Sequence, residues 1–232
     1  MGKRTSLVVN VSIAVVLLGL SVVVFTTDLS GIYMAVSGPH YNGNRNNQNV
    51  SIMINVYDNA HTQHIKQMMD ILEDRDVDAT WFVSGNWVKR NMALAKDMSE
   101  RFELGNLGLT HRNMRNLSEA NQRIEIQGTH DLVMGVAGVE MNLFAPPNGN
   151  FNRTTLRVAE SLGYTTIMWS KDTIDWRDKD ANIVFNRATQ NIMNGDLVLM
   201  HPCAHSLAAL PLIIDYYLSR GFDVVRVSEN IL

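Results

Sequence analysis

A short stretch in the middle of the chain has the spacing of a metal site that lacks one ligand. In FELGNLGLTHRNM, residues 102–114, His111 follows a Gly-Asn turn, and Leu107 stands four residues earlier, where a second histidine would complete a metal-binding pair. Other polar or aromatic side chains follow further apolar runs: Asp58, Asn106, Pro146, Pro147, Trp169, Asp172, Asp175, Trp176 and His201. An imidazole with a carboxylate is a partial shell for zinc or a similar divalent ion, and a second histidine beside an aspartate can act as a general acid.

The apolar runs that precede these side chains alternate with helical patterns. Strand patterns cover 50–57, 78–85, 102–106, 141–146, 165–170, 196–201 and 223–228, and helical patterns cover 62–74, 86–102, 117–138, 151–163, 180–193 and 206–221. This alternation predicts an α/β fold of parallel βα units. No Gly-rich phosphate-binding motif follows the first strand, which favours a barrel-like closure over a dinucleotide-binding sheet. In such barrels the strands' C-terminal ends carry the chemistry, so the side chains named above are expected on one rim.

The N-terminus predicts a membrane segment. Lys3 and Arg4 precede a run without charge from Leu7 to Phe25, which reaches about 28 Å as a helix and so nearly spans a hydrocarbon core of about 30 Å. The positive charges favour a cytoplasmic N-terminus, residues 1–6, and an extracellular C-terminal part. We therefore expect a single-pass signal-anchor at 7–25, a linker at 26–49 and one domain at 50–232. A cleaved signal peptide, with a small-x-small site at 35–37, is the alternative.

Charge and cysteine content limit the remaining possibilities. The formal net charge of the chain is -3, which gives no reason to expect nucleic acid as a partner. Cys203 is the single cysteine, so the chain forms no internal disulfide, and a Cys-x-His pair with His205 is interpreted as part of a loop rather than as a metal site.

Six segments together resemble the successive motifs of a known family. INVYDNA, DATWFVSGNWV, ELGNLGLTH, FAPPNGNFN, WSKDTIDWRD and GDLVLMHP are similar, in order and spacing, to the motifs of the polysaccharide deacetylase family, the NodB-homology domain of carbohydrate esterase family 4. The resemblance covers residues 50–232. It implies a distorted (β/α) barrel and hydrolysis of the N-acetyl group of a GlcNAc or MurNAc residue, in which metal-bound water attacks the carbonyl carbon.

The resemblance also implies that the site is degenerate. Tyr57 stands where the family has its catalytic base, Leu107 where it has a metal-binding histidine, and Ala145 where it has an arginine. The family positions that remain are the metal ligands Asp58 and His111, the catalytic residues Asp172, Asp175 and His201, and the substrate-binding residues Pro146, Pro147 and Trp176. A leucine cannot bind a metal, and a tyrosine is a poor base near neutral pH because its ordinary pKa is about 10. Occupancy by zinc or cobalt is therefore in doubt.

Three functions stay open. The first is a membrane-anchored, catalytically impaired relative that acts on or binds a cell-wall glycan such as peptidoglycan or a GlcNAc polymer. The second is an active deacetylase with a rebuilt site, in which His61 or His205, or less favourably His64, supplies the third metal donor. The third is a scaffold of the cell envelope that has lost both catalysis and glycan. The layout is similar to that of sporulation-associated envelope deacetylases.

Overall fold

Parallel strands form the centre of the fold. The computed structural model describes residues 37–58 and 60–232, in which eight strands make one sheet with the order β5-β4-β3-β2-β1-β7-β6, and β8 pairs with β1. Every strand pair is parallel. The strands are β1 Asn49–Val56, β2 Thr80–Val83, β3 Glu103–Asn106, β4 Leu143–Phe144, β5 Thr165–Thr166, β6 Lys171–Asp172, β7 Asp196–Met200 and β8 Asp223–Val224.

One extended segment, residues 165–172, joins the two ends of this sheet. Its first part, β5, pairs with β4, and its last part, β6, pairs with β7 at the other end of the strand order. The sheet therefore curls into a half-barrel, and the expected distorted barrel is confirmed in this coarser form. Within residues 37–58 and 60–232, no helix is long and apolar enough to cross a membrane. The predicted membrane segment at 7–25 lies outside the described residues.

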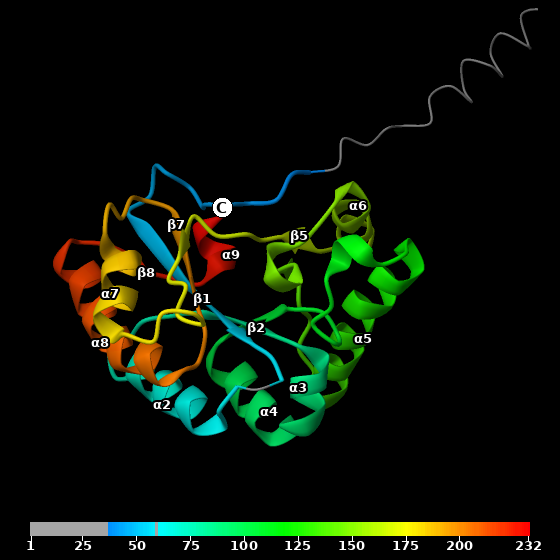
Figure 1. Cartoon of the computed structure of the whole chain (residues 1–232), viewed down its shortest axis with the longest axis horizontal. Coiled ribbons are helices and arrows are strands. Elements are labelled where there is room, and N and C mark those ends of the chain that lie inside the picture. Colours follow the sequence, from blue (N-terminus) through cyan, green and yellow to red (C-terminus); the bar gives the residue numbers. More distant parts are fainter. Residues whose placement is uncertain (1–36, 59) are drawn as a thin grey trace, which may run out of the picture. The chain divides into compact units, whose positions relative to one another are not determined.

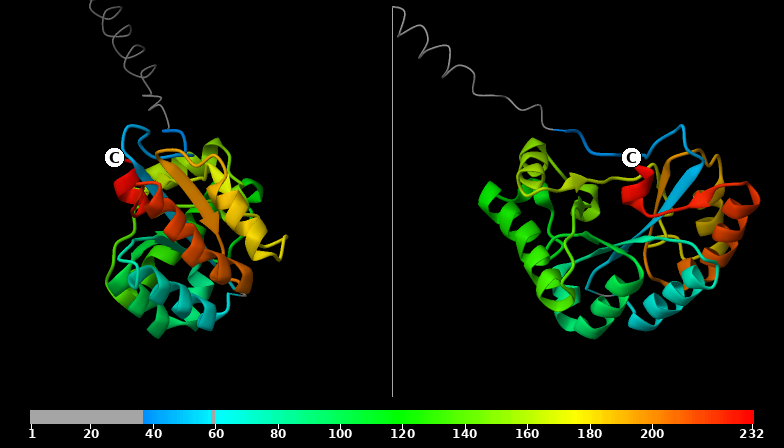
Figure 2. Two further views of the ribbon diagram at one scale, coloured as in Figure 1. Left: turned by 90° about the vertical axis from the view of Figure 1, so that its left-hand side faces the viewer. Right: turned by 180° about the vertical axis from the view of Figure 1, so that it is seen from behind.

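The helices cover the outside of the curled sheet. In Figure 1 they follow one another around it from α7 and α8 through α2, α3 and α4 to α5 and α6, and Figure 2 shows the same arrangement from behind. Their bounds are α2 Thr62–Glu73, α3 Gly85–Arg90, α4 Met92–Arg101, α5 Glu119–Ala137, α6 Arg153–Ser161, α7 Ala181–Thr189, α8 Ala204–Ser219 and α9 Val227–Asn230. The two short 3₁₀ helices are η1 Met114–Asn116 and η2 Pro147–Gly149.

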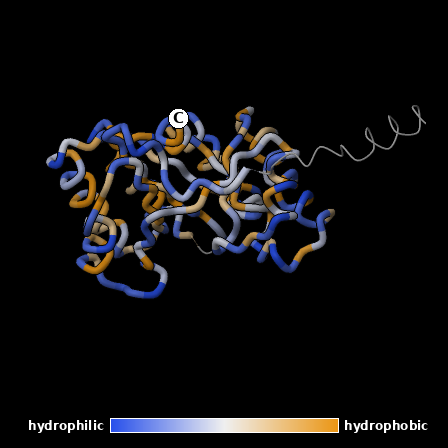
Figure 3. Tube along the Cα trace, turned by 90° about the horizontal axis from the view of Figure 1, so that it is seen from above, coloured by the Kyte–Doolittle hydropathy of each residue, from blue (hydrophilic) through white to orange (hydrophobic). Residues whose placement is uncertain are grey.

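Side-chain alternation along the strands separates two apolar clusters. In β1, Ile52 and Ile54 pack with the helices in the larger cluster, whereas Met53 and the following Tyr57 face the interior of the half-barrel. We call the second cluster the interior cluster; its buried members are Met53, Phe82, Leu107, Leu143, Ala145, Ile167, Leu197, Leu199 and Val227. Figure 3 shows hydrophilic stretches, drawn in blue, on the outer loops and helices. Side chains at the strand ends, such as Tyr57, pack against this interior cluster.

The structure differs from the sequence-based expectation in three elements. The strand expected at 165–170 is the short strand β5, and a second short strand, β6, begins just past the expected end. The single helix expected at 86–102 is two helices, α3 and α4, because Asn91 leaves the helical conformation with φ −130° and ψ 41°. The strand expected at 223–228 ends at Val224, and its second half begins the short helix α9. Periodicity did not show the break at Asn91, because both halves of that segment are helical. In 223–228 the apolar residues have spacings that a strand and a short helix share.

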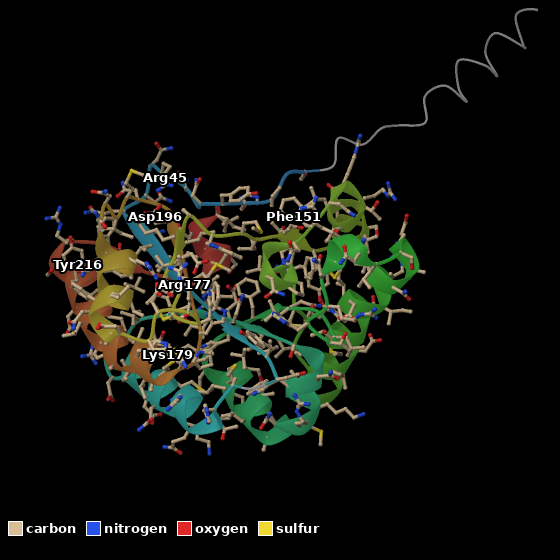
Figure 4. All side chains as sticks on the ribbon, viewed as in Figure 1. Arg45, Phe151, Arg177, Lys179, Asp196 and Tyr216 are labelled. Atoms are coloured by element: carbon tan, nitrogen blue, oxygen red, sulfur yellow. The ribbon has the colours of Figure 1, made fainter. Side chains whose placement is uncertain are left out.

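Residues 38–45, which we call the strap, are bonded to the sheet although the sequence suggested a linker at 26–49. The backbone N–H of His40 donates to the Thr166 carbonyl at 2.9 Å, and the backbone N–H of Gly43 donates to the Gly195 carbonyl at 2.7 Å. Arg45 binds the buried Asp196 of β7 at 2.8 Å, and the two labels lie side by side in Figure 4. The strap thus fastens the β5 side of the half-barrel to the start of β7.

Candidate functional site

A pocket of about 270 Å³ opens where several strands end. β1 supplies Asn55 and the following Tyr57, β7 supplies Leu199 and the following His201, and β6 supplies Asp172. The remaining lining residues come from loops and from η2: His111, Asn148, Trp169 and Trp176. The expected convergence of strand-end residues on one rim is therefore observed for five of those predicted from sequence, His111, Trp169, Asp172, Trp176 and His201.

The buried Asp175 and the partly buried His201, which lines the pocket, form a dyad. The Nδ1 atom of His201 lies 2.7 Å from Oδ1 of Asp175, and the His201 backbone N–H donates to Oδ2 at 2.6 Å. The Ser206 hydroxyl also donates to Oδ2. Burial on its own raises the pKa of Asp175, but these three hydrogen bonds hold the pKa below its ordinary value. An ionised Asp175 accepts a hydrogen bond from the Nδ1–H group of His201, which in a neutral imidazole places the lone pair on Nε2.

Tyr57 stacks on His111 at the side of the pocket. The two ring centroids are 4.2 Å apart with an interplanar angle of 8°, and the Tyr57 ring also meets His201 edge-on at 5.8 Å. Burial first, and then the proximity of His201, lower the pKa of His111 to about 4, although Asp58 opposes this shift. Burial, with Asp175 and Cys203 nearby, raises the pKa of Tyr57 above 10. At neutral pH the stack is therefore uncharged, and Tyr57 cannot act as a general base.

Asp58 lies at the end of β1 but bonds to an arginine. Its Oδ1 atom lies 2.5 Å from the guanidinium of Arg90, the last residue of α3, and both side chains are about half exposed. Asp58 does not line the pocket, whereas His111 does. The two retained family ligands thus differ in their surroundings: one faces the pocket and the other is paired with a cation.

These residues do not fit a divalent metal. A catalytic zinc site takes three protein ligands, and Leu107, which has no donor atom, stands at the third position. Of the two others, Asp58 is already paired with Arg90. Among residues 37–58 and 60–232, no group of three or more His, Cys, Asp or Glu side chains is placed to hold a metal. Any reaction or binding at the site therefore depends on the Asp175–His201 dyad and on the residues that line the pocket.

Leu107 and Ala145 belong to the interior cluster. Both are fully buried, and they pack with Phe82, Leu143 and Leu199 under the pocket. Pro146 and Pro147, expected to contact substrate, are also buried, and the next residue, Asn148, lines the pocket in their place. The positions at which the family resemblance implies a histidine and an arginine are thus part of a continuous apolar base.

Backbone strain concentrates around the pocket. Within the described part of the chain, five residues other than glycine have positive φ, and three of them lie here: His111 at 55°, Asn148 at 55° and Ile174 at 50°. A β-branched residue such as Ile174 is rarely found in this region. It stands between Asp172 and Asp175, and its backbone N–H donates to Asp172 Oδ1 at 2.8 Å. Strain of this kind persists where the surrounding structure holds the chain, which is common at functional sites.

The alternative metal donors lie outside the pocket, although His205 contacts the dyad. His61 precedes α2 and is exposed, and its ring centroid is 5.1 Å from that of His64. His205, in the first turn of α8, is bonded through Nε2 to the Asp175 carbonyl, and Cys203 Sγ lies 2.9 Å from the same nitrogen. None of the three lines the pocket.

Five residues of the site were not foreseen. Those that touch the pocket or its supporting groups are Asn55, Asn148, Leu199, Arg90 and Ser206. Asn55 had a sequence signal, because it is an amide within an otherwise apolar strand and shares the face of Tyr57 two residues later. Arg90 had no such signal, because its partner Asp58 is distant in the sequence. Ser206 had none, because its bond to Asp175 depends on where α8 begins.

Comparisons with known proteins agree with this geometry. The sequence model described as polysaccharide deacetylase matches residues 44–167. An uncharacterised protein of Bacillus subtilis is 32% identical over 82% of this chain and 60% of its own length, and a peptidoglycan-N-acetylglucosamine deacetylase of Bacillus cereus is 30% identical over 79% and 89%. This chain thus spans less than two thirds of the Bacillus subtilis protein.

Two solved structures of one related protein differ in their described activity. A pseudoenzyme of carbohydrate esterase family 4 from Bacillus anthracis is 33% identical with a TM-score of 0.81, and the match covers 84% of this chain and 69% of that one. A mutant of that pseudoenzyme, described as having restored enzymatic activity, matches at 31% identity with a TM-score of 0.80, covering 84% and 71%.

Proposed function

Because this chain belongs to the polysaccharide deacetylase family, we propose that its domain binds a glycan in the pocket without deacetylating it. The observation that carries the proposal is the contrast between the two parts of the pocket. The side at which the family holds its metal and arginine is apolar, with Leu107 and Ala145 fully buried. The aromatic rim and the Asp175–His201 dyad remain.

Hydrolysis would lack the groups that activate water. In the family reaction a metal lowers the pKa of water and a carboxylate removes its proton, and loss of a positioned base alone typically costs about 10²- to 10⁴-fold in rate. Tyr57 does not replace that base, because its pKa is raised above 10. The dyad alone could move a proton through Nε2 of His201, but it has no activated nucleophile to serve.

The pocket is suited to holding one sugar unit. Trp169, Trp176 and Tyr57 present aromatic faces, on which the apolar face of a sugar ring can pack, and Asn148 and Asp172 add polar groups that can bond to hydroxyls. The volume of about 270 Å³ is near the lower end of the roughly 300–1,000 Å³ of small-molecule sites.

The proposed glycan is peptidoglycan or another polymer of N-acetylglucosamine units. Support comes from the related Bacillus cereus protein, which is named a peptidoglycan-N-acetylglucosamine deacetylase. We further propose that the domain works outside the cell and is held at the membrane by residues 7–25, because that run carries no charge and follows two basic residues.

The test measures binding and reaction together. Purified full chain is incubated with insoluble peptidoglycan and with N-acetylglucosamine oligomers, with and without zinc or cobalt, while sedimentation reports binding and released acetate reports deacetylation. We expect binding, no acetate above background, and weaker binding by Trp176→Ala, whose side chain is 60% exposed and thus replaceable without disturbing the core. Acetate release at a steady rate would contradict the proposal, and absence of binding would favour a scaffold function.

A further inference from the structure

Asp172 is a carboxylate of the pocket without a cation partner. One of its oxygens accepts the Ile174 backbone N–H at 2.8 Å, and within residues 37–58 and 60–232 Asp172 forms no salt bridge. The residue is only partly buried and lines the pocket. Its second oxygen is therefore available to a positively charged group.

The basic residues of the same loop region are engaged elsewhere. Arg177 and Arg187 both bind Asp178, at 2.8 and 2.5 Å. Arg177 lies on the segment between β6 and α7, where Figure 4 labels it. No lysine or arginine is among the residues that line the pocket. The pKa of Arg177 is raised mainly by its hydrogen bond to Asp178 and further by the nearby Asp172, but Asp172 and Arg177 form no ion pair. Because Ala145 occupies the family's arginine position, Asp172 is the one carboxylate among the lining residues, and no cation lines the pocket beside it.

Asn55 also lines the pocket, but its carbonyl oxygen lies below the pocket surface. The residue is only 4% exposed, and within the described part of the chain its Oδ1 atom is buried and has no hydrogen-bond partner. A ligand in the pocket does not reach a buried atom, so Asp172 is the acceptor through which the pocket can recognise a cation.

Aromatic faces complete the surroundings. Trp169, Trp176 and Tyr57 also line the pocket, and the faces of such rings attract a cation within about 6 Å of the ring centre. An N-acetyl group carries no charge to pair with Asp172, and the residues at the family's metal-binding and arginine positions are the apolar Leu107 and Ala145.

We propose that the pocket selects a glycan unit with a free amino group, a de-N-acetylated hexosamine, over the N-acetylated unit. The inference rests on the proposed function and specifies its ligand. The ammonium group offers three N–H donors and one positive charge, which match the Asp172 carboxylate and the aromatic faces. The reaction class that must supply this ligand is amide hydrolysis of an N-acetylated glycan, so the protein would recognise the product of catalytically active deacetylases.

The experiment compares two ligands that differ only in acetylation. The full chain is titrated by calorimetry with the tetramer of β-1,4-linked glucosamine and with the tetramer of N-acetylglucosamine. We expect wild-type protein to bind the glucosamine tetramer at least about tenfold more tightly, because only its ammonium group forms a charge-assisted hydrogen bond with Asp172. Asp172→Asn keeps the size of the side chain and is expected to abolish the preference. Trp176→Ala is expected to weaken both ligands, the glucosamine tetramer more, because this ligand also loses the contact of its charge with the ring.

A matched charge control separates the pocket from the overall charge. Asp97→Asn removes the same charge from the exposed face of α4, outside the pocket, and should keep the preference. Equal binding of both tetramers by wild type, a preference that survives Asp172→Asn, or one that disappears in Asp97→Asn would each overturn the inference while leaving glycan binding standing. If wild type binds neither tetramer nor peptidoglycan, the proposed function itself fails.

Discussion

At the scale of single residues, Leu107 determines what the interior of the half-barrel can bind. Its side chain is fully buried in the interior cluster, so Leu107→His would place an imidazole against apolar neighbours. We expect a loss of about 1–3 kcal/mol in the free energy of unfolding without metal, or about 2–4 °C in melting temperature for each kcal/mol. Zinc should raise the melting temperature of this variant but not that of wild type, because the introduced imidazole would join His111 and Asp58 as a third ligand.

The control for this prediction is Leu107→Gln, which buries a polar group of similar size that zinc binds poorly. It should show the loss of stability without the response to zinc. A zinc-dependent rise in wild type equal to that of Leu107→His would mean that other donors of this chain hold a metal. Differential scanning fluorimetry with zinc and with chelator gives both comparisons.

Asp175 gives the fold a dependence on pH. Its pKa is lowered in the folded protein, so its charge stabilises the fold above the unfolded-state pKa of about 3.9, and this contribution is lost as pH falls through the folded-state pKa. Asp175→Asn should therefore lower the free energy of unfolding at pH 7 by about 2 kcal/mol or more. Urea unfolding at pH 7 and at pH 3 should show this difference shrinking in acid. A difference that is constant or larger at pH 3 would contradict the assignment.

At the scale of elements, α7 depends on its cap. The Asp180 side chain accepts the backbone N–H groups of Asn182 and Ile183 at 2.7 and 3.3 Å, which would otherwise lack partners at the helix start. Asp180→Ala should lower the free energy of unfolding by about 1 kcal/mol, and Asp180→Asn, which retains a capping oxygen, by much less. Thermal unfolding followed by circular dichroism compares the two. Equal losses would show that charge rather than the cap matters.

Most elements could be predicted from periodicity, because their apolar spacing reflects which faces are buried. The strand expected at 50–57 is β1, and the helix expected at 62–74 is α2. Elements whose form depends on distant contacts could not be predicted. The strap is rich in Asn and Gly and has no periodicity, and its order comes from bonds to Gly195 and Asp196 that lie about 150 residues away.

At the scale of the whole molecule, the strap fastens the half-barrel through a partly buried ion pair. Arg45 lies 2.8 Å from Asp196, whose side chain is only 2% exposed. Arg45→Ala should cost about 1–3 kcal/mol, because it leaves a buried carboxylate without its close cation. Arg75→Ala is the matched control, since Arg75 pairs with the exposed Asp215, and should cost about 0–1 kcal/mol. Urea unfolding that shows equal losses would contradict a fastening role of the strap.

The candidate site was predictable where it depends on strand ends. His111, Asp172, Trp176 and His201 meet at the pocket because parallel strands place their C-terminal ends together. The pairing of Asp58 with Arg90 was not predictable, because it depends on where α3 ends. The unsatisfied acceptor of Asn55 was also hidden, since a sequence does not reveal which donors a buried amide will lack.

The strap also fixes the side from which the chain enters the domain. Its bonds reach Gly195, just before β7, and it leads into the start of β1, whereas the pocket residues Tyr57 and His201 follow the opposite ends of those two strands. A sensor surface coupled to the protein at Ser37 would therefore face the side of the half-barrel opposite the pocket. Protein immobilised in that orientation should bind soluble glycans, because its pocket opens toward the flowing solution.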